Sequence, residues 1–325
     1  IVGAGNATKI IKTGMVITVN GSKGEVYKGA LTQAQTSPAS PGTGRVNLKA
    51  QTLEKKPGSS LKTATKVYVN MAEPSRVNAI SKLNTDGIGL LRAEFMIADI
   101  GTHPKKLIAE HKEHFFITKL AADLSKFCQA FNPRPIVYRA TDFKTNEYRN
   151  LAGGREFEPQ ESNPMLGFRG AYRYISDPRV FELELEAIKM VRNKYGYKNL
   201  WLMIPFVHTV KEMEEVKKII GASGLARSAS FKLWMMVEIP SNVILIDKFC
   251  ELGIDGVSIG SNDLTMLILG ADRDNDEVAQ VFDERNPAVL WAIERVIRTC
   301  TKYGVTSSIC GQAPSDYPEL VEKLV

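Results

Sequence analysis

Seven runs of apolar residues recur between Lys66 and Gly311, and each shows little polar alternation. Strands that helices cover on both faces have continuous apolar sequences, whereas half-exposed strands alternate apolar and polar residues. The runs lie at 66–71, 87–95, 135–140, 199–207, 232–240, 256–263 and 306–311. They predict a parallel sheet that is buried on both faces.

Stretches with helical periodicity separate these runs, the longest at 104–131 and 288–304. A strand followed by a helix, repeated many times, predicts an α/β fold of the (β/α)8 TIM-barrel type. The eighth strand is expected either in the segment MLGFR, 165–169, or after Val325. A doubly wound open sheet is the alternative, but no glycine-rich nucleotide-binding turn follows the first strand.

The first 64 residues depart from this pattern. Residues 1–32 combine alternation with glycine turns and predict two short strands joined near 21–24. Residues 33–64 are rich in Ser, Thr, Pro and Gly and predict a flexible linker, so the barrel would occupy 65–325. The chain begins without Met and stops within a predicted helix, so we expect it to be part of a longer protein.

Charge and cysteine usage exclude several function classes. The formal net charge is +6, but Lys and Arg are spread along the chain without a basic block, which argues against a nucleic-acid partner. No apolar window approaches the length of about 18 residues that a membrane span needs. The four cysteines have neither disulfide-framework nor metal-ligand spacing, which predicts reduced thiols and a cytoplasmic location.

Polar residues follow the apolar runs at the points where the strands should end. In a barrel of this type the catalytic residues lie at the carboxyl ends of the strands. The residues at or just after these ends are Arg92, Glu94, Arg139, Glu238, Asn262, Asp263 and Cys310, with Arg169 and Arg273 in nearby loops. We therefore expect these side chains to converge on one cleft.

The residue types indicate what such a cleft would bind. Several guanidinium groups would repel one another unless an anion lay between them, and their geometry matches phosphate and carboxylate. Glu238 and Asp263 offer oxygen ligands that suit Mg²⁺ or Mn²⁺, and such a metal could stabilise a developing enolate. Nearby arginines would favour the thiolate of Cys310, which could then exchange a proton with the ligand.

Each of these features also has a purely structural explanation. An arginine after a strand is often an ion-pair partner, and an isolated cysteine is usually a small core residue, as we expect for Cys128, Cys250 and Cys300. His103 is expected to be exposed on a helix. His208, at another strand end, could face the cleft. The coincidence of so many polar groups at equivalent strand ends favours a functional site.

Six sequence motifs together resemble the carboxyl-terminal barrel of the phosphoenolpyruvate-utilising enzymes, and the synthase branch in particular. The motifs are DGIGLLRAEFM, YRATDFKTNEYRNLAGG, NPMLGFRGAYRY, MMVEIPSN, VSIGSNDLTMLILGADRDN and SSICGQAPSD. The resemblance implies that Arg92, Arg139, Arg169 and Arg273 hold the phosphate and carboxylate of phosphoenolpyruvate. It implies that Ser261 and Asn262 lie beside the phosphate and that Glu94 organises the arginines. Glu238 and Asp263 match magnesium ligands, and Cys310 matches the cysteine that handles the proton at C3.

The same resemblance implies the wider reaction. Residues 1–32 are similar to the tail of a swivelling phosphohistidine domain, with an ATP-binding domain expected further upstream. The whole enzyme would then use ATP to convert pyruvate into phosphoenolpyruvate. Self-association through the barrel is also implied. His208 departs from the arginine of the synthase pattern, which affects contacts at the rim. The alternatives are a barrel of the enzyme I or pyruvate phosphate dikinase type, or a scaffold barrel without turnover.

Overall fold

The computed structural model describes residues 10–20, 25–29, 64–273 and 275–324. The chain divides into two units, 1–59 and 60–325, which are considered separately. In the first unit, β1 (Ile17–Asn20) pairs antiparallel with β2 (Glu25–Lys28) in the register Ile17 with Lys28. The predicted hairpin is confirmed, whereas the linker expected at 33–64 lies outside the described residues except for its last position.

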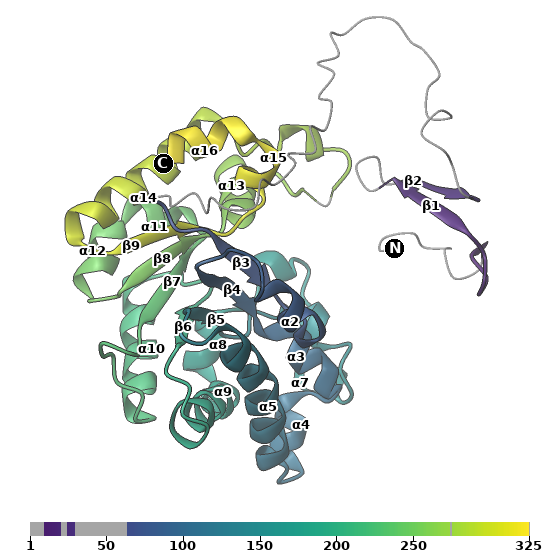
Figure 1. Ribbon diagram of the computed structural model, residues 1–325, viewed down its shortest axis with the longest axis vertical. Coiled ribbons are helices and arrows are strands. Elements are labelled where there is room, and N and C mark those ends of the chain that lie inside the picture. Colours follow the sequence, from purple (N-terminus) through teal and green to yellow (C-terminus); the bar gives the residue numbers. More distant parts are fainter. Residues whose placement is uncertain (1–9, 21–24, 30–63, 274, 325) are drawn as a thin grey trace, which may run out of the picture. The chain divides into compact units, whose positions relative to one another are not determined.

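The second unit is built on one parallel sheet of seven strands in sequential order (Figure 1). The strands are β3 (Tyr68–Met71), β4 (Gly87–Arg92), β5 (Ile136–Arg139), β6 (Leu200–Ile204), β7 (Leu233–Val237), β8 (Gly256–Ile259) and β9 (Thr306–Ile309). Each predicted apolar run contains one of them, because runs of this kind are stable only where both faces of a strand are covered. The predicted fold class is therefore confirmed as a curled parallel α/β sheet.

Helices fill the connections between the strands (Figure 1). Between β3 and β6 they are η2 (Pro74–Arg76), α2 (Val77–Ile80), α3 (Ala93–Ile100), α4 (Pro104–Ala109), α5 (Glu113–Phe131), α6 (Thr145–Tyr148), α7 (Gly154–Phe157), η3 (Pro164–Leu166), α8 (Ala171–Ser176), α9 (Arg179–Lys189) and the π-helix η4 (Met190–Lys194). After β6 they are α10 (Val210–Ala222), α11 (Pro240–Ile244), α12 (Ile246–Glu251), α13 (Ser261–Leu269), η5 (Ala279–Val281), α14 (Pro287–Tyr303), α15 (Ala313–Asp316) and α16 (Pro318–Leu324).

The segment predicted as a possible eighth strand is not one, and two strands next to site residues end earlier than predicted. The segment MLGFR is not a strand: η3 includes its first two residues, and Pro164 at the start of η3 lacks the N–H that a ladder needs. β4 ends at Arg92, so Glu94 lies in the first turn of α3. β8 ends at Ile259, so Asn262 and Asp263 lie in the first turn of α13. No eighth strand is present in this sheet among the described residues.

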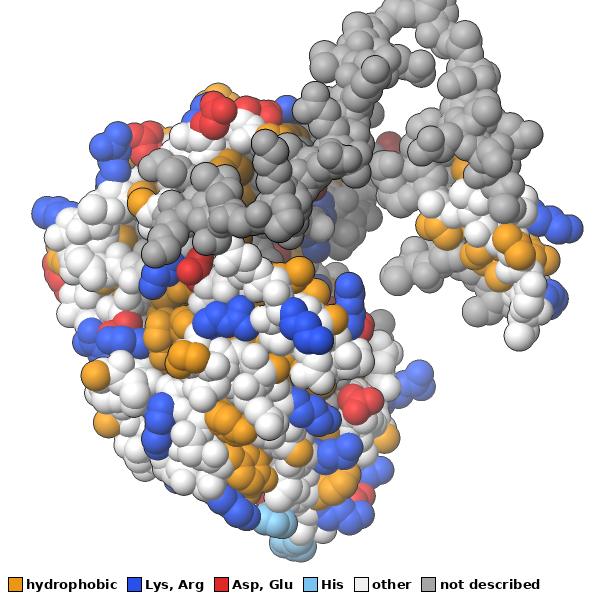
Figure 2. All heavy atoms as spheres, viewed as in Figure 1, with side chains coloured by type: hydrophobic (Ala, Val, Ile, Leu, Met, Phe, Trp, Pro, Cys, Tyr) orange, Lys and Arg blue, Asp and Glu red, His pale blue; other side chains and the backbone are white. Residues whose placement is uncertain are grey.

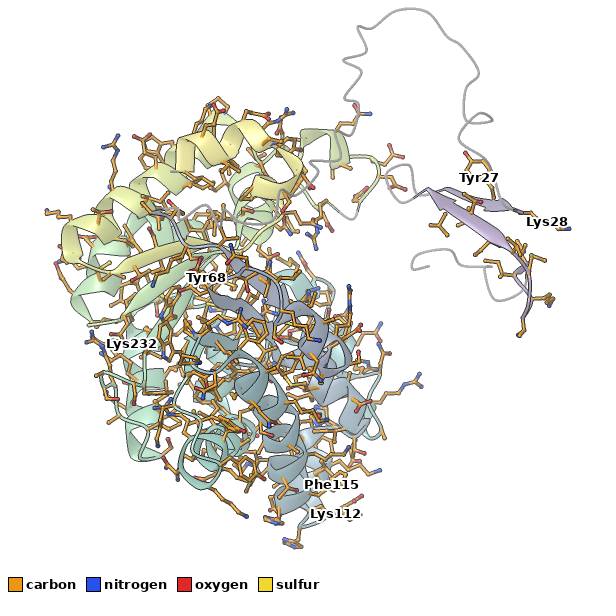
Figure 3. The ribbon with its side chains drawn as sticks, viewed as in Figure 1. Tyr27, Lys28, Tyr68, Lys112, Phe115 and Lys232 are labelled. Atoms are coloured by element: carbon orange, nitrogen blue, oxygen red, sulfur yellow. The ribbon has the colours of Figure 1, made fainter. Side chains whose placement is uncertain are left out.

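The two faces of the sheet bury separate apolar clusters. The inner face holds a small cluster made by Leu90, Val137, Met203, Trp234 and Met236. The outer face packs against the helices in a much larger core, in which α5 covers β5 and α14 covers β8 and β9. The absence of a side chain at Gly89 in β4 lets Tyr68 of β3 (labelled in Figure 3) pack closely against it. A Cβ at Gly89 would lie 2.9 Å from the Cβ of Tyr68. Burial on both faces explains the continuous apolar sequence of these strands.

Basic residues form no continuous block on the face shown in Figure 2, where they alternate with acidic, apolar and neutral side chains. Among the residues that the structure describes, no helix combines the length and apolar character needed to cross a membrane.

Candidate active site

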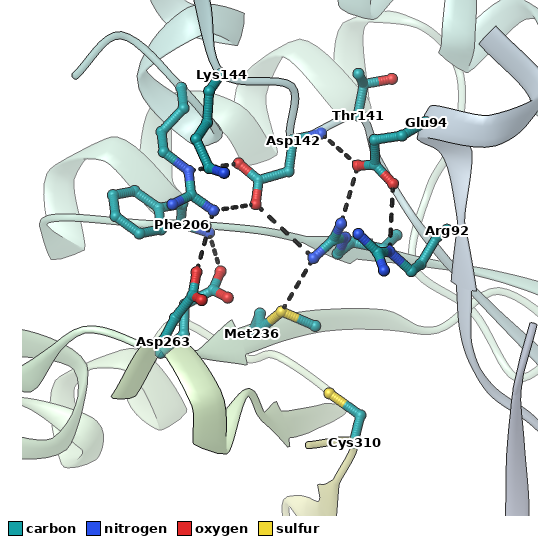
Figure 4. Close-up of polar contacts among 12 residues, drawn as sticks. Arg92, Glu94, Thr141, Asp142, Lys144, Phe206, Met236, Asp263 and Cys310 are labelled. Carbon is teal, nitrogen blue, oxygen red and sulfur yellow. Dashed lines mark hydrogen bonds and ion pairs between the residues drawn. The ribbon is translucent and has the colours of Figure 1, made fainter. Parts of the chain in front are cut away.

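A cavity of about 310 Å³ opens at the carboxyl ends of the strands. Six of the residues predicted from the sequence line it, namely Arg92, Glu94, Arg139, Arg169, Asp263 and Arg273. Asp142, Lys144 and Glu147 line it as well, together with apolar side chains that include Phe95 and Met165. The predicted convergence is therefore observed for these six residues (Figure 4), whereas Glu238, Asn262 and Cys310 do not line this cavity.

Glu94 lies between two of the arginines. Its Oε1 accepts hydrogen bonds from Nη2 of Arg139 at 2.9 Å and from the backbone N–H of Asp142 at 2.8 Å. Its Oε2 lies 3.8 Å from Nε of Arg92. Glu94 can reach these groups because β4 ends at Arg92. The buried Glu94 then lies in the first turn of α3, next to the end of β5. One carboxylate thus fixes the positions of two guanidinium groups.

Asp142 holds Arg169 through a paired contact. Nε and Nη2 of Arg169 donate to the two carboxylate oxygens of Asp142 at 3.0 and 2.6 Å, and Nη2 also lies 3.2 Å from Oδ2 of Asp263. The Arg169 guanidinium lies over the ring of Phe206, 3.8 Å from its centroid. Two-point pairing and ring stacking restrict a guanidinium much more than a single ion pair does.

Buried acids keep both arginines charged. Burial lowers the pKa of Arg139, but Glu94, Asp142 and Glu238 raise it further, so the net shift is upward. Arg169 behaves in the same way beside Asp142. In return, although burial raises the pKa of Asp142, Arg169 lowers it below its ordinary value. The wall of the cavity therefore carries permanent positive charge next to permanent negative charge.

The remaining cations are nearer the rim. The side chain of Arg92 is 48% exposed and lies 5.7 Å from the centroid of Phe95. Lys144 is close to its neighbour Glu147, whose Oε1 accepts from Nζ at 3.3 Å. Arg273 follows α13 and contacts Asn262. These less enclosed groups can adjust to a ligand more freely than Arg139 and Arg169.

Glu238 is placed by a strained turn of the backbone. It follows β7 and is buried, and its Oε1 accepts from the backbone N–H of Phe206 at 2.6 Å. Phe206 has a φ of 46°, a left-handed conformation that is rare for a bulky side chain. The same residue therefore supplies a backbone donor to Glu238 and the ring beneath Arg169, which explains why the strain is tolerated here.

Glu238 and Asp263 fit the predicted divalent cation. Burial, together with the charges of Asp142 and Asp263, raises the pKa of Glu238 to about 8. A cation between these carboxylates would relieve their repulsion, and oxygen ligands suit Mg²⁺ and also Mn²⁺. Among the described residues no group of three or more Asp, Glu, His or Cys side chains could hold a metal ion. A usual Mg²⁺ site needs only one or two carboxylates, which share the ion with substrate oxygens and water.

Cys310 follows β9 and is held from both sides. Its N–H donates to the carbonyl of Ile259 in β8 at 3.0 Å, and its own carbonyl accepts from Nδ2 of Asn70 in β3 at 2.8 Å. Burial raises the pKa of its thiol to about 11, against the opposing effects of Ser258 and Arg139. Burial outweighs Arg139, which does act in the predicted direction by lowering this pKa, so the thiol is the favoured form. Cys128, Cys250 and Cys300 are buried in helices, as predicted.

Ser261 and Asn262 occupy the first turn of α13, next to Asp263. They do not line the cavity directly. Both donate hydrogen bonds to the same buried carboxylate, that of Glu284, which precedes α14. Helix N-termini such as that of α13 carry a positive dipole end, and they are common phosphate-binding positions in barrels of this type.

The structure places two histidines that the sequence singled out, and only His103 differs from expectation. His208 does not line the cavity: its Nδ1 lies 3.1 Å from Glu212 Oε2 on α10. His103 is buried, not exposed. Its Nδ1 accepts from the N–H of Lys105, so Nε2 carries the proton and donates to Glu158 at 3.0 Å. Glu158 also pairs with both terminal nitrogens of Arg173.

Sequence reasoning missed Asp142, Lys144 and Glu284. Asp142 had a usable signal, since it follows β5 by three positions in the same loop that Arg139 begins. Lys144 lies two residues further along that loop. Glu284 had no such signal, because it lies in a polar loop between η5 and α14, far in sequence from any strand end.

Comparison with known proteins identifies the family of this chain and several of its relatives. The family model described as PEP-utilising enzyme, PEP-binding domain, matches residues 48–325. The chain is 50% identical to a probable phosphoenolpyruvate synthase of Staphylothermus marinus and 49% identical to a phosphoenolpyruvate synthase of Aeropyrum pernix. It is 43% identical to the phosphoenolpyruvate synthase of Pyrococcus furiosus. Each match covers 100% of this chain but 39%, 40% and 39% of the relative, so the chain spans about two fifths of their length.

Proposed function

The chain belongs to the PEP-utilising enzymes, and on that premise we propose that it is the part of a phosphoenolpyruvate synthase that binds pyruvate and phosphoenolpyruvate. The observation that carries the proposal is one cavity lined by Arg92, Arg139, Arg169 and Arg273, with Asp263 in its wall and a thiol at a neighbouring strand end. Phosphoenolpyruvate is a small anion with a phosphate and a carboxylate, which such a set of guanidinium groups matches.

The arginines would act by position and charge. Arg139 and Arg169 are fixed by buried acids, so little rearrangement is needed when the substrate binds. Arg92 and Arg273, which are less constrained, would close on the anion from the rim. In phosphoryl transfer most of the catalytic effect comes from positioning and from neutralising charge on the transferred group.

Glu238 and Asp263 would hold Mg²⁺, or Mn²⁺ in its place. When bound, the ion would supply positive charge next to the oxygen of the enolate that forms from pyruvate. The N–H of Phe206 keeps one oxygen of Glu238 engaged, which leaves the other oxygen for a cation. Asp263 would be shared between the ion and Arg169.

Cys310 would exchange the proton at C3. When phosphoenolpyruvate is converted to pyruvate, the S–H bond breaks, its proton forms the methyl group, and the electron pair stays on sulfur. In the synthetic direction the thiolate accepts a methyl proton and leaves the enolate. A pKa near 11 favours the thiol in the free protein, which suits the proton-donating step.

The complete reaction requires parts outside the barrel. We propose that ATP phosphorylates a histidine of a swivelling domain, whose tail is residues 1–32, and that this domain carries the phosphoryl group to the enolate. The intracellular supply of ATP and pyruvate supports a cytoplasmic location. A homo-oligomer is expected as well, and the exposed Ile244 on α11, Leu245 between α11 and α12, and Trp291 on α14 supply apolar surface for it. Light scattering during size-exclusion chromatography tests that expectation.

The experiment that tests the function is Cys310→Ala in the full-length protein. We expect conversion of pyruvate to phosphoenolpyruvate to fall by about 10² to 10⁴, the usual contribution of a general acid or base. Calorimetry should show that phosphoenolpyruvate binding is retained, because Cys310 adds no charge to the cavity. Near-normal turnover would refute the proton-transfer role.

A matched pair, Glu238→Gln and Asp263→Asn, tests the metal ligands. Both changes should weaken the Mg²⁺ dependence of phosphoenolpyruvate binding. Unchanged metal titration curves would contradict that assignment. A wild-type protein that does not bind phosphoenolpyruvate would instead favour a scaffold barrel.

A further inference from the structure

Glu284 is a buried carboxylate with no place in the reaction described above. It lies in the loop between η5 and α14, and only 4% of the residue is exposed. Burial raises its pKa, whereas the hydrogen bond from Ser261 and the charge of Arg273 lower it. A buried acid is costly unless its oxygens are used, so its partners indicate what it does.

The first partner is Ser261. Its Oγ donates a hydrogen bond to Oε1 of Glu284. Ser261 also fills the space beside Gly311, where an added Cβ would lie 1.7 Å from the same Oγ. Gly311 directly follows Cys310. Glu284 therefore holds the Ser261 side chain, and the backbone at Gly311, next to Cys310, packs against that side chain.

The second partner is Asn262. Its neighbours determine its amide orientation: Nδ2 donates to Oε1 of Glu284 at 3.1 Å, and Oδ1 accepts from Nη1 of Arg273 at 2.8 Å. The opposite orientation would place the amide nitrogen against the guanidinium. Glu284 thus selects the orientation in which Asn262 can hold Arg273, a residue that lines the cavity.

We propose that Glu284 is a positioning residue for the substrate-binding arginine Arg273, acting through Asn262, and that it sets the Cys310 strand end through Ser261. This proposal rests on the proposed function, because it assumes that Arg273 binds the substrate anion. Glu284 itself does not line the cavity and touches no substrate. It acts by holding the side chains of Ser261 and Asn262, in the first turn of α13, in one rotamer each.

The two hydrogen bonds share one acceptor atom, Oε1, and this makes the proposal easy to test. Glutamine has an oxygen that can take the place of Oε1, so Glu284→Gln should keep both contacts and most of the function. Glu284→Ala removes the acceptor. Glu284→Asp keeps the charge, but its side chain is one methylene shorter, so the carboxylate no longer reaches both partners. This variant replaces Glu284→Ala in the test if the alanine variant fails to fold.

The measurement is the dissociation constant of phosphoenolpyruvate in the full-length protein with Mg²⁺, by calorimetry. We expect Glu284→Ala, or Glu284→Asp, to raise it roughly 10- to 100-fold, which corresponds to one lost hydrogen bond to a charged group. We expect Glu284→Gln to stay within about 3-fold of wild type, because the amide oxygen keeps both hydrogen bonds and only the charge of the acceptor is lost. The thermal midpoint of each variant is recorded alongside.

A double-mutant cycle separates positioning from a merely structural role. In an Arg273→Ala background, Glu284→Ala should raise the dissociation constant much less than in wild type, because the group through which it acts is already gone. An equal effect in both backgrounds overturns the proposal. A lowered thermal midpoint with unchanged affinity overturns it too. If the wild-type protein itself does not bind phosphoenolpyruvate, the proposed function fails, and this result is distinct from the others.

Discussion

The thiol of Cys310 illustrates how one residue can be tuned by opposing neighbours. Arg139 and Ser258 lower its pKa, but burial raises it more, and the result is about 11. Thiolates react faster than thiols, so a neutral thiol beside the buried Arg139 should react slowly with thiol reagents. Charge on the ligand would then decide when the proton moves.

Glu184 is a second residue whose environment sets its titration. It is fully buried on α9, and its Oε2 accepts from the hydroxyl of Tyr138 at 2.7 Å and from the N–H of Thr141 at 3.1 Å. Burial raises its pKa from 4.5 to about 7 despite these bonds. Between pH 4.5 and about pH 7, Glu184 therefore binds its proton more tightly in the folded protein than in the unfolded chain.

The free energy of unfolding should therefore fall as pH rises through this window, by on the order of 3 kcal/mol from Glu184 alone. Above about pH 7 the contribution should be lost. Glu184→Gln removes the titrating group, so its stability should depend less on pH. Urea unfolding of both proteins at about pH 5 and about pH 8 measures the difference. Equal pH dependence in wild type and variant would contradict the assignment.

At the scale of single elements, the site depends on how strands give way to helices. The apolar runs predicted where the strands lie, but they continued past the true ends at Arg92 and Ile259. Hydrophobicity does not distinguish the last strand residue from a helix turn that is also buried. For this reason Glu94 and Asp263 were predicted as site residues but placed in the wrong element.

Partners of the predicted residues were harder to predict. Arg139 and Arg169 stand out because a charge follows an apolar run, whereas Asp142 and Glu284 lie within polar loops. Their importance comes from contacts between segments distant in sequence: 27 positions separate Asp142 from Arg169 and 23 separate Ser261 from Glu284. Only the folded structure brings such pairs together.

Gly170 offers a test of the turn that carries Phe206. It precedes α8 with a φ of 58°, and a Cβ there would lie 2.4 Å from the Cβ of Phe206 and 2.9 Å from the carbonyl oxygen of Pro205. Gly170→Ala should destabilise the protein by about 3 kcal/mol or more, because both backbone strain and overpacking contribute. It should also weaken phosphoenolpyruvate binding, since Phe206 contacts both Arg169 and Glu238.

Gly196→Ala is the matched control. Gly196 has a φ of 81° but no atom within 4 Å of an added Cβ, so only strain of about 1 kcal/mol is expected and binding should not change. Chemical denaturation and calorimetry of both variants supply the comparison. Similar losses of stability and affinity in the two would show that contact with the Phe206 turn is unimportant.

At the scale of the whole molecule, the fold class follows from the sequence because the five central strands, β4 to β8, are buried on both faces. The order of the strands also follows, since neighbours in sequence are neighbours in the sheet. What the sequence did not reveal is how the two outermost strands are connected. Asn70 of β3 donates to the carbonyl of Cys310, across 240 positions, at a point where the register of β3 shifts between Val69 and Asn70.

Because this hydrogen bond joins the two outermost strands, protection of the Cys310 thiol from a reagent should report when these strands come together. Contacts between distant segments form late, because a long loop must close before they can contribute. In a refolding experiment with pulses of a thiol reagent, Cys128 within α5 should become protected before Cys310 does. Simultaneous protection would argue against this order. Cys310, the proposed proton-transfer group, would then be the last part of the sheet to be assembled, so a partly folded chain could bury its core and still lack activity.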